Sequence, residues 1–206
     1  MPRIIAGEKK GLKLEAPRGE ATRPTGDRVK EAIFSILQAE LRGVNFLDLF
    51  GGSGQMGLEA ASRGAARVWI VEKDHHAAGI IRKNIEKAGF DKSVSLIQAP
   101  VGVALSRLHE AGESMDFIYF DPPWREECRF FSQLRDPLLR IMKEHSRLLL
   151  ETDEAAEKEL IALSEPALNL LRTCHYGRAM VLFYGKYGEK EAFSSSLRNE
   201  EKSCFA

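Results

Sequence analysis

Residues 46–57 have the sequence FLDLFGGSGQMG, an apolar run with one acid that leads into a glycine-rich loop. Gly52, Gly54 and Gly57 satisfy the spacing G-x-G-x-x-G, which is typical of a strand–loop–helix unit that binds a nucleotide-like cofactor. The motif is weak by itself, because glycines are also needed where a helix packs closely on a strand. The stretch predicts a Rossmann-like unit and leaves the cofactor open.

Asp48 lies in the predicted strand just before this loop and helps to choose between cofactors. A dinucleotide would bring an anionic pyrophosphate to the loop and the start of the next helix, where a carboxylate is unfavourable. S-adenosylmethionine would bring an ammonium and a sulfonium, which an acid attracts. The alternative is a structural role, in which the Asp48 carboxylate accepts hydrogen bonds from loop amides.

Glu72 ends the second predicted strand, eighteen residues after Gly54. An acid at this place in a Rossmann-like sheet accepts hydrogen bonds from a ribose diol. NAD and S-adenosylmethionine both carry that diol, so Glu72 supports a nucleoside cofactor without naming it. The alternative is an exposed acid at the end of a strand.

Strand and helix patterns alternate from Val44 onward, which predicts an α/β fold with a mostly parallel sheet and helices on both faces. The last two strands leave no room for a helix between them and predict an antiparallel hairpin. This order is that of the seven-stranded, Rossmann-like class I methyltransferase fold. The expected strands are 45–50, 67–72, 93–97, 115–120, 146–151, 168–175 and 179–186, and the expected helices are 55–63, 75–88, 101–110, 127–143 and 154–163.

The tetrapeptide Asp121-Pro122-Pro123-Trp124 follows a strongly apolar predicted strand. Two prolines fix the backbone and remove two donors, so the carbonyl oxygens of Asp121 and Pro122 and the Asp121 carboxylate form a stiff row of acceptors. An exocyclic amine of a base needs such acceptors, because they favour a localised lone pair and stabilise the positive charge that develops during methyl transfer. Trp124 would stack on the base. The alternative is a strand-ending turn with a buried tryptophan.

The first 30 residues carry eight Lys or Arg and four Asp or Glu, a local charge of +4 in a chain with no net charge. We expect two short strands at 3–6 and 12–15 around a turn, and then a helix from about Asp27 to Leu41, capped by Thr25 or Asp27. Lys30 falls outside the apolar stripe of this helix. A basic arm of this kind can bind a phosphate backbone, or it can be a solvated hairpin.

The composition, with 44% hydrophobic and 29% charged residues, is that of a globular protein with a substantial core. The sequence contains neither a run of eighteen apolar residues nor a signal-peptide pattern. Its three cysteines fit neither a disulfide framework nor a zinc site, and its five histidines form no constellation, so no metal is expected. We expect a cytoplasmic monomer with an N-terminal extension (1–42), a cofactor-binding domain (43–188) and a flexible tail (189–206).

These motifs, taken in order, resemble those of the RsmD family, bacterial enzymes that methylate guanine N2 in small-subunit ribosomal RNA. The resemblance covers residues 3–186. It implies S-adenosylmethionine as the cofactor and ribosomal RNA, within the small subunit or its assembly intermediate, as the partner. The residues that carry it are Arg3-Ile4-Ile5-Ala6-Gly7, Lys10-Gly11, Thr22-Arg23-Pro24-Thr25, Asp27-Arg28-Val29, the glycine loop and Asp121-Pro122-Pro123.

By this resemblance, three groups of residues form the site. The four residues from Asp121 to Trp124 hold the target amine. The cofactor is held by Asp48, Gly51, Gly52, Ser53, Gly54, Glu72, Lys73, Gln98 and Ala99. RNA is contacted by Arg3, Lys9, Lys10, Arg23, Thr25 and Arg28, although Arg23 and Arg28 could equally form internal salt bridges.

The chain departs from the family pattern at three places. Gly51 stands where alanine is usual, a change that we expect to be harmless, and Trp124 stands where Phe or Tyr is commoner. The acid often found near Ala99 is absent, so Gln98 or a backbone carbonyl would have to bind the adenine amine.

Three other functions stay open at the level of sequence. Adenine-N6 methylation of DNA or RNA uses the same amine chemistry. A non-catalytic RNA-binding assembly factor could retain the fold. An NAD-dependent oxidoreductase would need a catalytic group in a substrate domain, which the sequence does not show.

Overall fold

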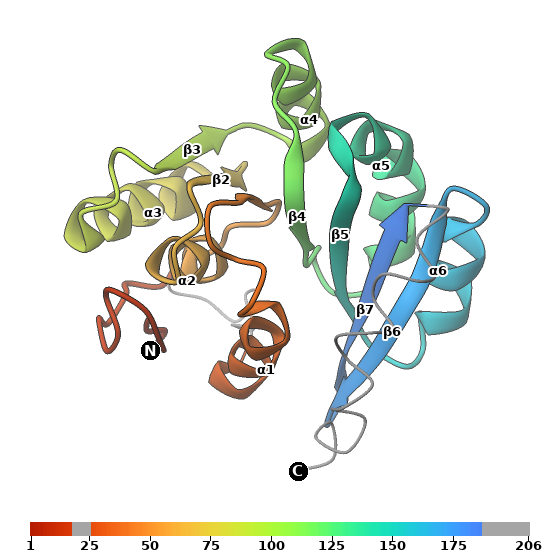
Figure 1. Ribbon diagram of the computed structural model, residues 1–206, viewed down its shortest axis with the longest axis horizontal. Helices are drawn as coiled ribbons and strands as arrows, with labels where there is room; N and C mark the ends of the chain where they lie inside the picture. Colours follow the sequence, from red (N-terminus) through yellow and green to blue (C-terminus); the bar gives the residue numbers. More distant parts are fainter. Residues whose placement is uncertain (18–25, 187–206) are drawn as a thin grey trace.

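The computed structural model describes residues 1–17 and 26–186, in which seven strands form one sheet (Figure 1). The strands are β1 (Asn45–Asp48), β2 (Arg67–Glu72), β3 (Val94–Gln98), β4 (Met115–Phe120), β5 (Met142–Thr152), β6 (Leu168–Tyr176) and β7 (Ala179–Lys186). Their order is β3-β2-β1-β4-β5-β7-β6. β1 to β5 pair in parallel, and β7 pairs antiparallel with both β5 and β6. The predicted fold class, with its C-terminal hairpin, is confirmed.

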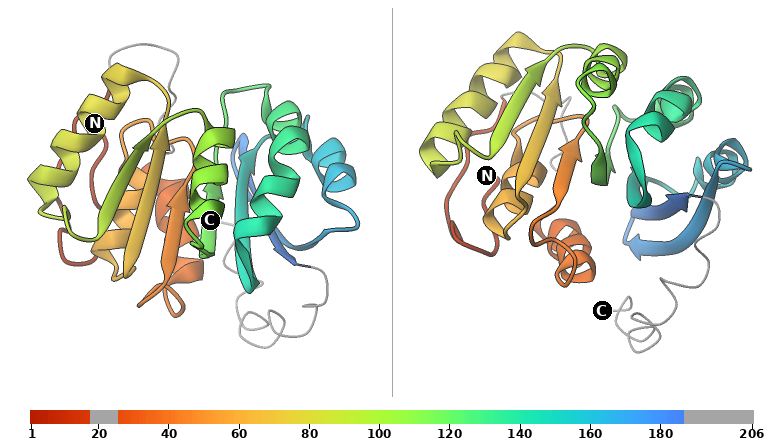
Figure 2. Two further views of the ribbon diagram at one scale, coloured as in Figure 1. Left: turned by 90° about the horizontal axis from the view of Figure 1, so that it is seen from above. Right: turned by 45° about the horizontal axis from the view of Figure 1, so that its top comes forward.

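Helices cover both faces of the sheet (Figure 2). They are α1 (Asp27–Leu37), α2 (Gln55–Ser62), α3 (His75–Ala88), α4 (Val101–Glu110), α5 (Glu127–Ile141) and α6 (Glu157–Ser164). Apolar residues of α1, α2 and α3 share one buried cluster with one side of the sheet, and those of α4, α5 and α6 share a second cluster with the other side. The strands are apolar on both sides because both sides are covered.

The residues before α1 cover the outer side of α2, and we call residues 2–15 the N-terminal arm. Ile4 and Leu14 of the arm are fully buried in the same cluster as α2 and α3. Every residue of α2 is buried, as expected for a helix with the sheet on one side and the arm on the other.

The arm differs from the predicted hairpin of two strands. It contains a single antiparallel bridge, between Arg3 and Lys13. Some backbone bonds cross between its two halves, such as those from the Ile4 N–H to the Leu12 carbonyl oxygen and from the Leu14 N–H to the Pro2 carbonyl oxygen, both at 2.9 Å, but other arm amides bond to α2. The carboxylate of Glu59 accepts the N–H groups of Ile5 and Ala6 at 2.7 and 3.0 Å.

The first helix also differs from expectation. α1 ends at Leu37 rather than Leu41, and its N-cap is Gly26, which makes no side-chain cap, so the expected cap by Asp27 is wrong. Lys30 is fully buried. Its ammonium donates to the carbonyl oxygen of Arg3 at 2.5 Å and to Gln55 Oε1 at 3.2 Å.

Within residues 1–17 and 26–186, no helix is long and apolar enough to cross a membrane. The same residues contain no group of three or more His, Cys, Asp or Glu that could hold a metal ion.

Candidate active site

The sheet order creates a switch point between β1 and β4. From β1 the chain moves to β2 and β3 on one side, and later to β4 and β5 on the other. Ligands of open α/β sheets bind in the crevice outside the carboxyl ends of the strands at such a point. Asp48 and Glu72 end β1 and β2, and Asp121 follows β4, so all three lie at this edge.

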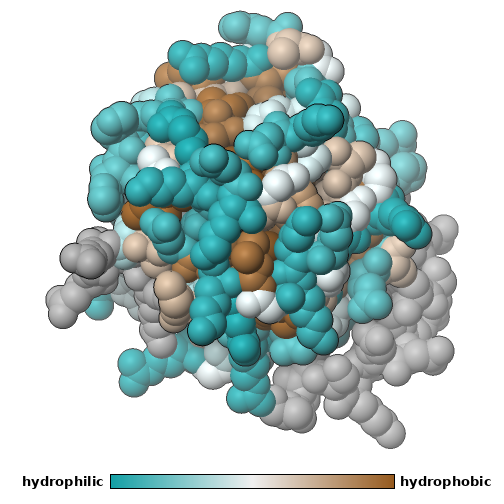
Figure 3. All heavy atoms as spheres, turned by 90° about the vertical axis from the view of Figure 1, so that its left-hand side faces the viewer, coloured by the Kyte–Doolittle hydropathy of each residue, from teal (hydrophilic) through white to brown (hydrophobic). Residues whose placement is uncertain are grey.

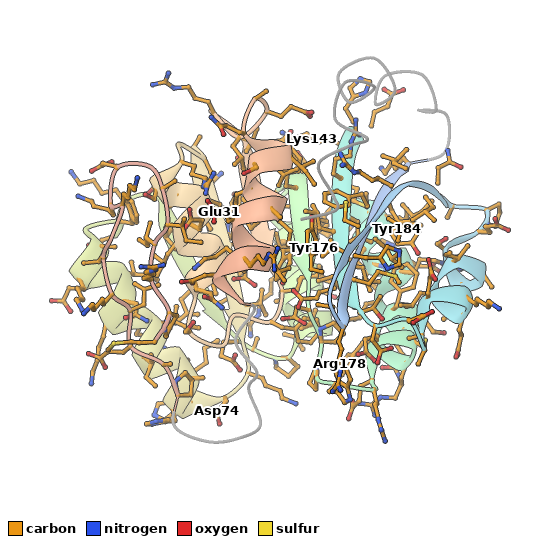
Figure 4. All side chains as sticks on the ribbon, turned by 90° about the horizontal axis from the view of Figure 1, so that it is seen from below. Glu31, Asp74, Lys143, Tyr176, Arg178 and Tyr184 are labelled. Atoms are coloured by element: carbon orange, nitrogen blue, oxygen red, sulfur yellow. The ribbon has the colours of Figure 1, made fainter. Side chains whose placement is uncertain are left out.

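Strand pairing brings the two halves of the site together. Asp48 pairs in register with Tyr119 of β4, two residues before Asp121. Neighbouring strands lie about 4.8 Å apart, so the tetrapeptide stands beside the glycine loop. Figure 4 shows Asp74, just after β2, and Arg178, between β6 and β7, at this end of the sheet, with Lys143 of β5 at the opposite end.

The glycine loop is shaped by contacts with β2. Gly52 and Gly54 have φ values of 54° and 78°, which favour glycine. Gly51 donates to the carbonyl oxygen of Val71 at 2.8 Å. A Cβ atom on Gly51 would stand 2.5 Å from Cγ2 of Ile70. Any residue larger than glycine at position 51 would therefore clash with the Ile70 side chain.

Asp48 is buried, and only one of its two carboxylate oxygens has a hydrogen-bond partner among the described residues. Its Oδ2 accepts the N–H of Gly57 at 3.1 Å, so the expected structural role is part of what it does. Its Oδ1 has no hydrogen-bond partner among the described residues. The pKa of Asp48 is raised from 3.8 to about 7, mainly by burial and in part by the Glu72 carboxylate, while the nearby backbone N–H groups of Gly57 and Phe50 oppose the rise. A cation beside Oδ1 would remove this penalty.

Glu72 ties β2 to the glycine loop. One carboxylate oxygen accepts the N–H of Gly52 at 3.0 Å, and the other accepts the N–H of Asp74 at 2.8 Å. Each oxygen can accept a second hydrogen bond, so the carboxylate can still receive a diol. Lys73 is exposed in the same turn.

Gln98 and Ala99 follow this edge at the end of β3. Gln98 is exposed, and its Oε1 accepts a bond from Arg82 Nη2 at 2.6 Å. Its Nε2 lies 3.2 Å from Nδ1 of His75. A cofactor amine bound by the Gln98 side chain would share its oxygen with Arg82. Ala99 is buried and donates its N–H to the Glu72 carbonyl oxygen at 3.2 Å.

The tetrapeptide after β4 presents its aromatic ring to solvent. The Trp124 side chain is 55% exposed, so the alternative of a buried tryptophan is wrong. Pro122 is buried and Asp121 is half-buried. The Pro123 carbonyl oxygen accepts the N–H of Glu126 at 3.0 Å, which closes a tight turn, and Arg125 in this turn has a φ of 64°. Trp124 is therefore exposed within this turn, just after the carboxyl end of β4.

The proposed RNA-contacting residues differ in their ion pairs and in their exposure. Arg3 pairs with Asp27 at 2.9 Å, and Lys9 pairs with Glu8 at 2.9 Å. Lys10 and Arg28 are exposed. Arg23 and Thr25 lie outside the described residues. The face formed by the arm and α3 is mostly hydrophilic (Figure 3), and its exposed basic side chains include Lys10, Lys13, Arg82, Lys83 and Lys87.

Sequence patterns missed three buried polar residues around the loop. Lys30, Glu59 and Asn84 are fully buried. Each joins the arm to α2 or the glycine loop across a long stretch of sequence. The only signal in the sequence was a polar residue within a helix, which ordinarily predicts a surface position.

Comparison with known proteins assigns the family. The model of the family described as Conserved hypothetical protein 95, the RsmD family, matches residues 2–185. The chain belongs to this family.

Two relatives of this chain carry ribosomal names. The chain is 33% identical over 189 residues to Putative rRNA methyltransferase YlbH of Bacillus subtilis, covering 90% of this chain and all of that one. It is 38% identical over 125 residues to Ribosomal RNA small subunit methyltransferase D of Escherichia coli, a match that spans about 60% of each chain.

Solved structures agree on the fold. The chain superimposes on Putative methyltransferase yhhF from Escherichia coli with a TM-score of 0.75 at 24% identity, covering 92% of this chain and 99% of that one. SMU.776, described as a putative methyltransferase in complex with S-adenosylhomocysteine, matches with a TM-score of 0.63 at 15% identity, over 75% of this chain and 48% of its own length.

Proposed function

We propose that this protein transfers the methyl group of S-adenosylmethionine to the exocyclic N2 of a guanine in small-subunit ribosomal RNA. The observation that supports it most is the pairing of β1 with β4. It places the half-satisfied, buried carboxylate of Asp48 one strand away from the acceptor row at Asp121. A buried carboxylate with one unpartnered oxygen suits a cationic cofactor, and a row of acceptors suits an amine.

The residues present fit S-adenosylmethionine. Asp48 would face its positive charge, Glu72 its ribose diol, and the loop from Gly51 to Gly54 would lie along it. The cofactor supplies an activated methyl group on a sulfonium. A dinucleotide fits less well, because the Gly52 and Gly57 amides already donate to Glu72 and Asp48.

The tetrapeptide would act on the amine. The Asp121 carboxylate and the neighbouring carbonyl oxygens accept its two N–H bonds and align the nitrogen. As the nitrogen gains its bond to the methyl carbon and the carbon–sulfur bond breaks, these oxygens would stabilise the positive charge on nitrogen. The proton that the nitrogen then loses would pass to the Asp121 carboxylate. Trp124 would stack on the base, which must leave its helix or lie in an unpaired region. The rest of the catalysis is positioning.

The basic arm supports an RNA substrate. Its exposed lysines adjoin those of α3, since Lys87 of α3 bonds to the Lys13 carbonyl oxygen at 2.7 Å. Phosphate contacts position a nucleic acid without reading its sequence. The ribosomal names of both relatives support ribosomal RNA as the target, and the second supports the small subunit.

The test uses small ribosomal subunits from cells that lack this protein, incubated with the purified protein and methyl-labelled S-adenosylmethionine. We expect label in the RNA as N2-methylguanosine after digestion to nucleosides. Asp121→Ala should abolish transfer while cofactor binding, measured by calorimetry, persists. Label in N6-methyladenosine would support the adenine alternative. Label in protein or DNA alone, or tight RNA binding without transfer, would reject the proposal.

A further inference from the structure

The N-terminal arm and the glycine loop are joined through one buried amide. Asn84 of α3 is fully buried. Its Nδ2 donates to the carbonyl oxygen of Ser53 in the glycine loop at 2.9 Å and to the carbonyl oxygen of Glu15 in the arm at 2.9 Å. Its Oδ1 accepts the N–H of Glu15 at 2.8 Å. Both amide hydrogens are used, so the side chain has one orientation in which all three bonds form.

A second buried group makes a parallel connection. Lys30 joins the carbonyl oxygen of the arm residue Arg3 to the side chain of Gln55, the first residue of α2. Its ammonium also lies 3.7 Å from Asp27 Oδ1. Ser53 and Gln55 flank Gly54, so the arm is linked to the loop on both sides of one glycine.

Other arm contacts reach α2 but not the loop. The Ser62 hydroxyl donates to the Ala6 carbonyl oxygen at 2.7 Å and accepts the Lys9 N–H at 3.0 Å. The Glu59 carboxylate accepts the N–H groups of Ile5 and Ala6. These bonds fasten the arm, whereas Asn84 and Lys30 connect it to the part of the molecule that would carry the cofactor.

We infer that Asn84 is a positioning residue that couples the arm to the glycine loop, so that cofactor and RNA bind cooperatively. The inference rests on the proposed function. A ligand that orders the loop also orders the Ser53 carbonyl, and through Asn84 it orders Glu15 and the arm. The second ligand then meets an arm that is already fixed. The coupling is reciprocal: RNA bound to the arm must raise the affinity for the cofactor by the same factor by which the cofactor raises the affinity for RNA.

The experiment measures coupling rather than activity. The dissociation constant for small ribosomal subunits from cells lacking this protein is measured with and without saturating S-adenosylhomocysteine. For the unaltered protein we expect the cofactor product to tighten binding by about 5- to 150-fold, the usual range for coupled sites. In Asn84→Ala the ratio of the two constants should fall towards one.

Ser62→Ala is the matched control. It removes two bonds between the arm and α2 but none to the loop. We expect weaker binding of the ribosomal subunit with the coupling ratio retained. Equal loss of coupling in both variants would mean that the arm needs only to be attached, and the role of Asn84 would be rejected.

Two further measurements keep the inference testable if Asn84→Ala does not fold. Gln55→Ala breaks the Lys30 connection and should also lower the ratio. In the unaltered protein, S-adenosylhomocysteine should slow hydrogen exchange in a peptide spanning residues 2–16. Unchanged hydrogen exchange would overturn the inference and leave the proposed function standing. The same holds if both ligands bind to the unaltered protein and the ratio of its two dissociation constants is one. A protein that binds neither ligand overturns the proposed function instead.

Discussion

Asp48→Asn should abolish a pH dependence that the buried carboxylate imposes on stability. Burial raises the folded-state pKa of Asp48 from 3.8 to about 7. Between these values the folded protein binds a proton that the unfolded chain releases. The free energy of unfolding therefore falls as pH rises through this window and levels off above the folded pKa. Asparagine can keep the acceptor for the Gly57 N–H and cannot ionise.

The size of the effect follows from the shift. One unit of pKa corresponds to about 1.36 kcal/mol, so a shift of roughly three units corresponds to about 4 kcal/mol in total. From pH 5 to pH 8, where the shift is only partly spanned, the unaltered protein should lose about 3 kcal/mol relative to Asp48→Asn. Both proteins contain the same five histidines, so their titration cancels in the difference.

The assay is urea unfolding of both proteins at pH 5, 6, 7 and 8 without cofactor. The difference in unfolding free energy between them should change with pH in the stated direction. A difference in unfolding free energy that does not change with pH would show that Asp48 is ionised in the folded protein throughout this range. The argument that Asp48 Oδ1 needs a cation beside it would then fail.

A cation beside Asp48 should lower its pKa, so cofactor binding at pH 6 should release close to one proton. Calorimetry in buffers of different ionisation enthalpy measures this release. Asp48→Asn should release none. Binding of S-adenosylmethionine without proton release in the unaltered protein would place the positive charge elsewhere.

The remaining predictions concern the rim of the site, the loop and the arm. Trp124→Ala should raise KM for the ribosomal substrate roughly 5- to 150-fold, from about 1–3 kcal/mol of lost stacking, with unchanged cofactor affinity. Trp124→Phe should act weakly, and equal effects of both variants would exclude stacking. Glu72→Gln leaves one oxygen for the amides of Gly52 and Asp74 and should weaken cofactor binding in calorimetry; unchanged affinity would remove Glu72 from the cofactor site. Gly7→Ala should destabilise more than Gly43→Ala in urea unfolding, because both glycines have a φ near 82° but only a Cβ at Gly7 meets another atom, Ser62 O at 1.9 Å; equal losses would show that the arm does not pack on Ser62.

Most of the fold could be predicted because the elements after Val44 are short and bounded by clear signals. β2 and β4 have the predicted bounds, as do α3 and α4. β5 begins at Met142, four residues before the predicted start, and includes the polar stretch Lys143-Glu144-His145. The pairing of β5 with β4 is irregular between Met142 and Arg147, and the Lys143 ammonium bonds to the Asp116 carboxylate of β4 at 2.7 and 2.8 Å. Apolar patterning does not report an extension of this kind, because its residues are polar.

The contacts around the loop could not be predicted, because they join residues far apart in the chain. Lys30 was expected outside the apolar stripe of its helix. It is buried because the Arg3 carbonyl and the Gln55 amide satisfy its ammonium there. The placement of Asp48, Glu72 and Asp121 at one edge of the sheet could be predicted, since each ends or follows a strand whose neighbours the alternation of elements determines. Their roles in a site stay a prediction.

The choice of cofactor does not follow from the glycine spacing, which dinucleotide-binding proteins share. We propose S-adenosylmethionine because of the backbone N–H groups that the loop already uses. Gly52 donates to Glu72, Gly57 donates to Asp48, and Gly54 donates to the Gly51 carbonyl oxygen at 2.6 Å. A pyrophosphate would have to displace two carboxylates from these amides and then lie beside the same negative charges. A cationic ligand needs no such displacement, and the unpartnered oxygen of Asp48 attracts it.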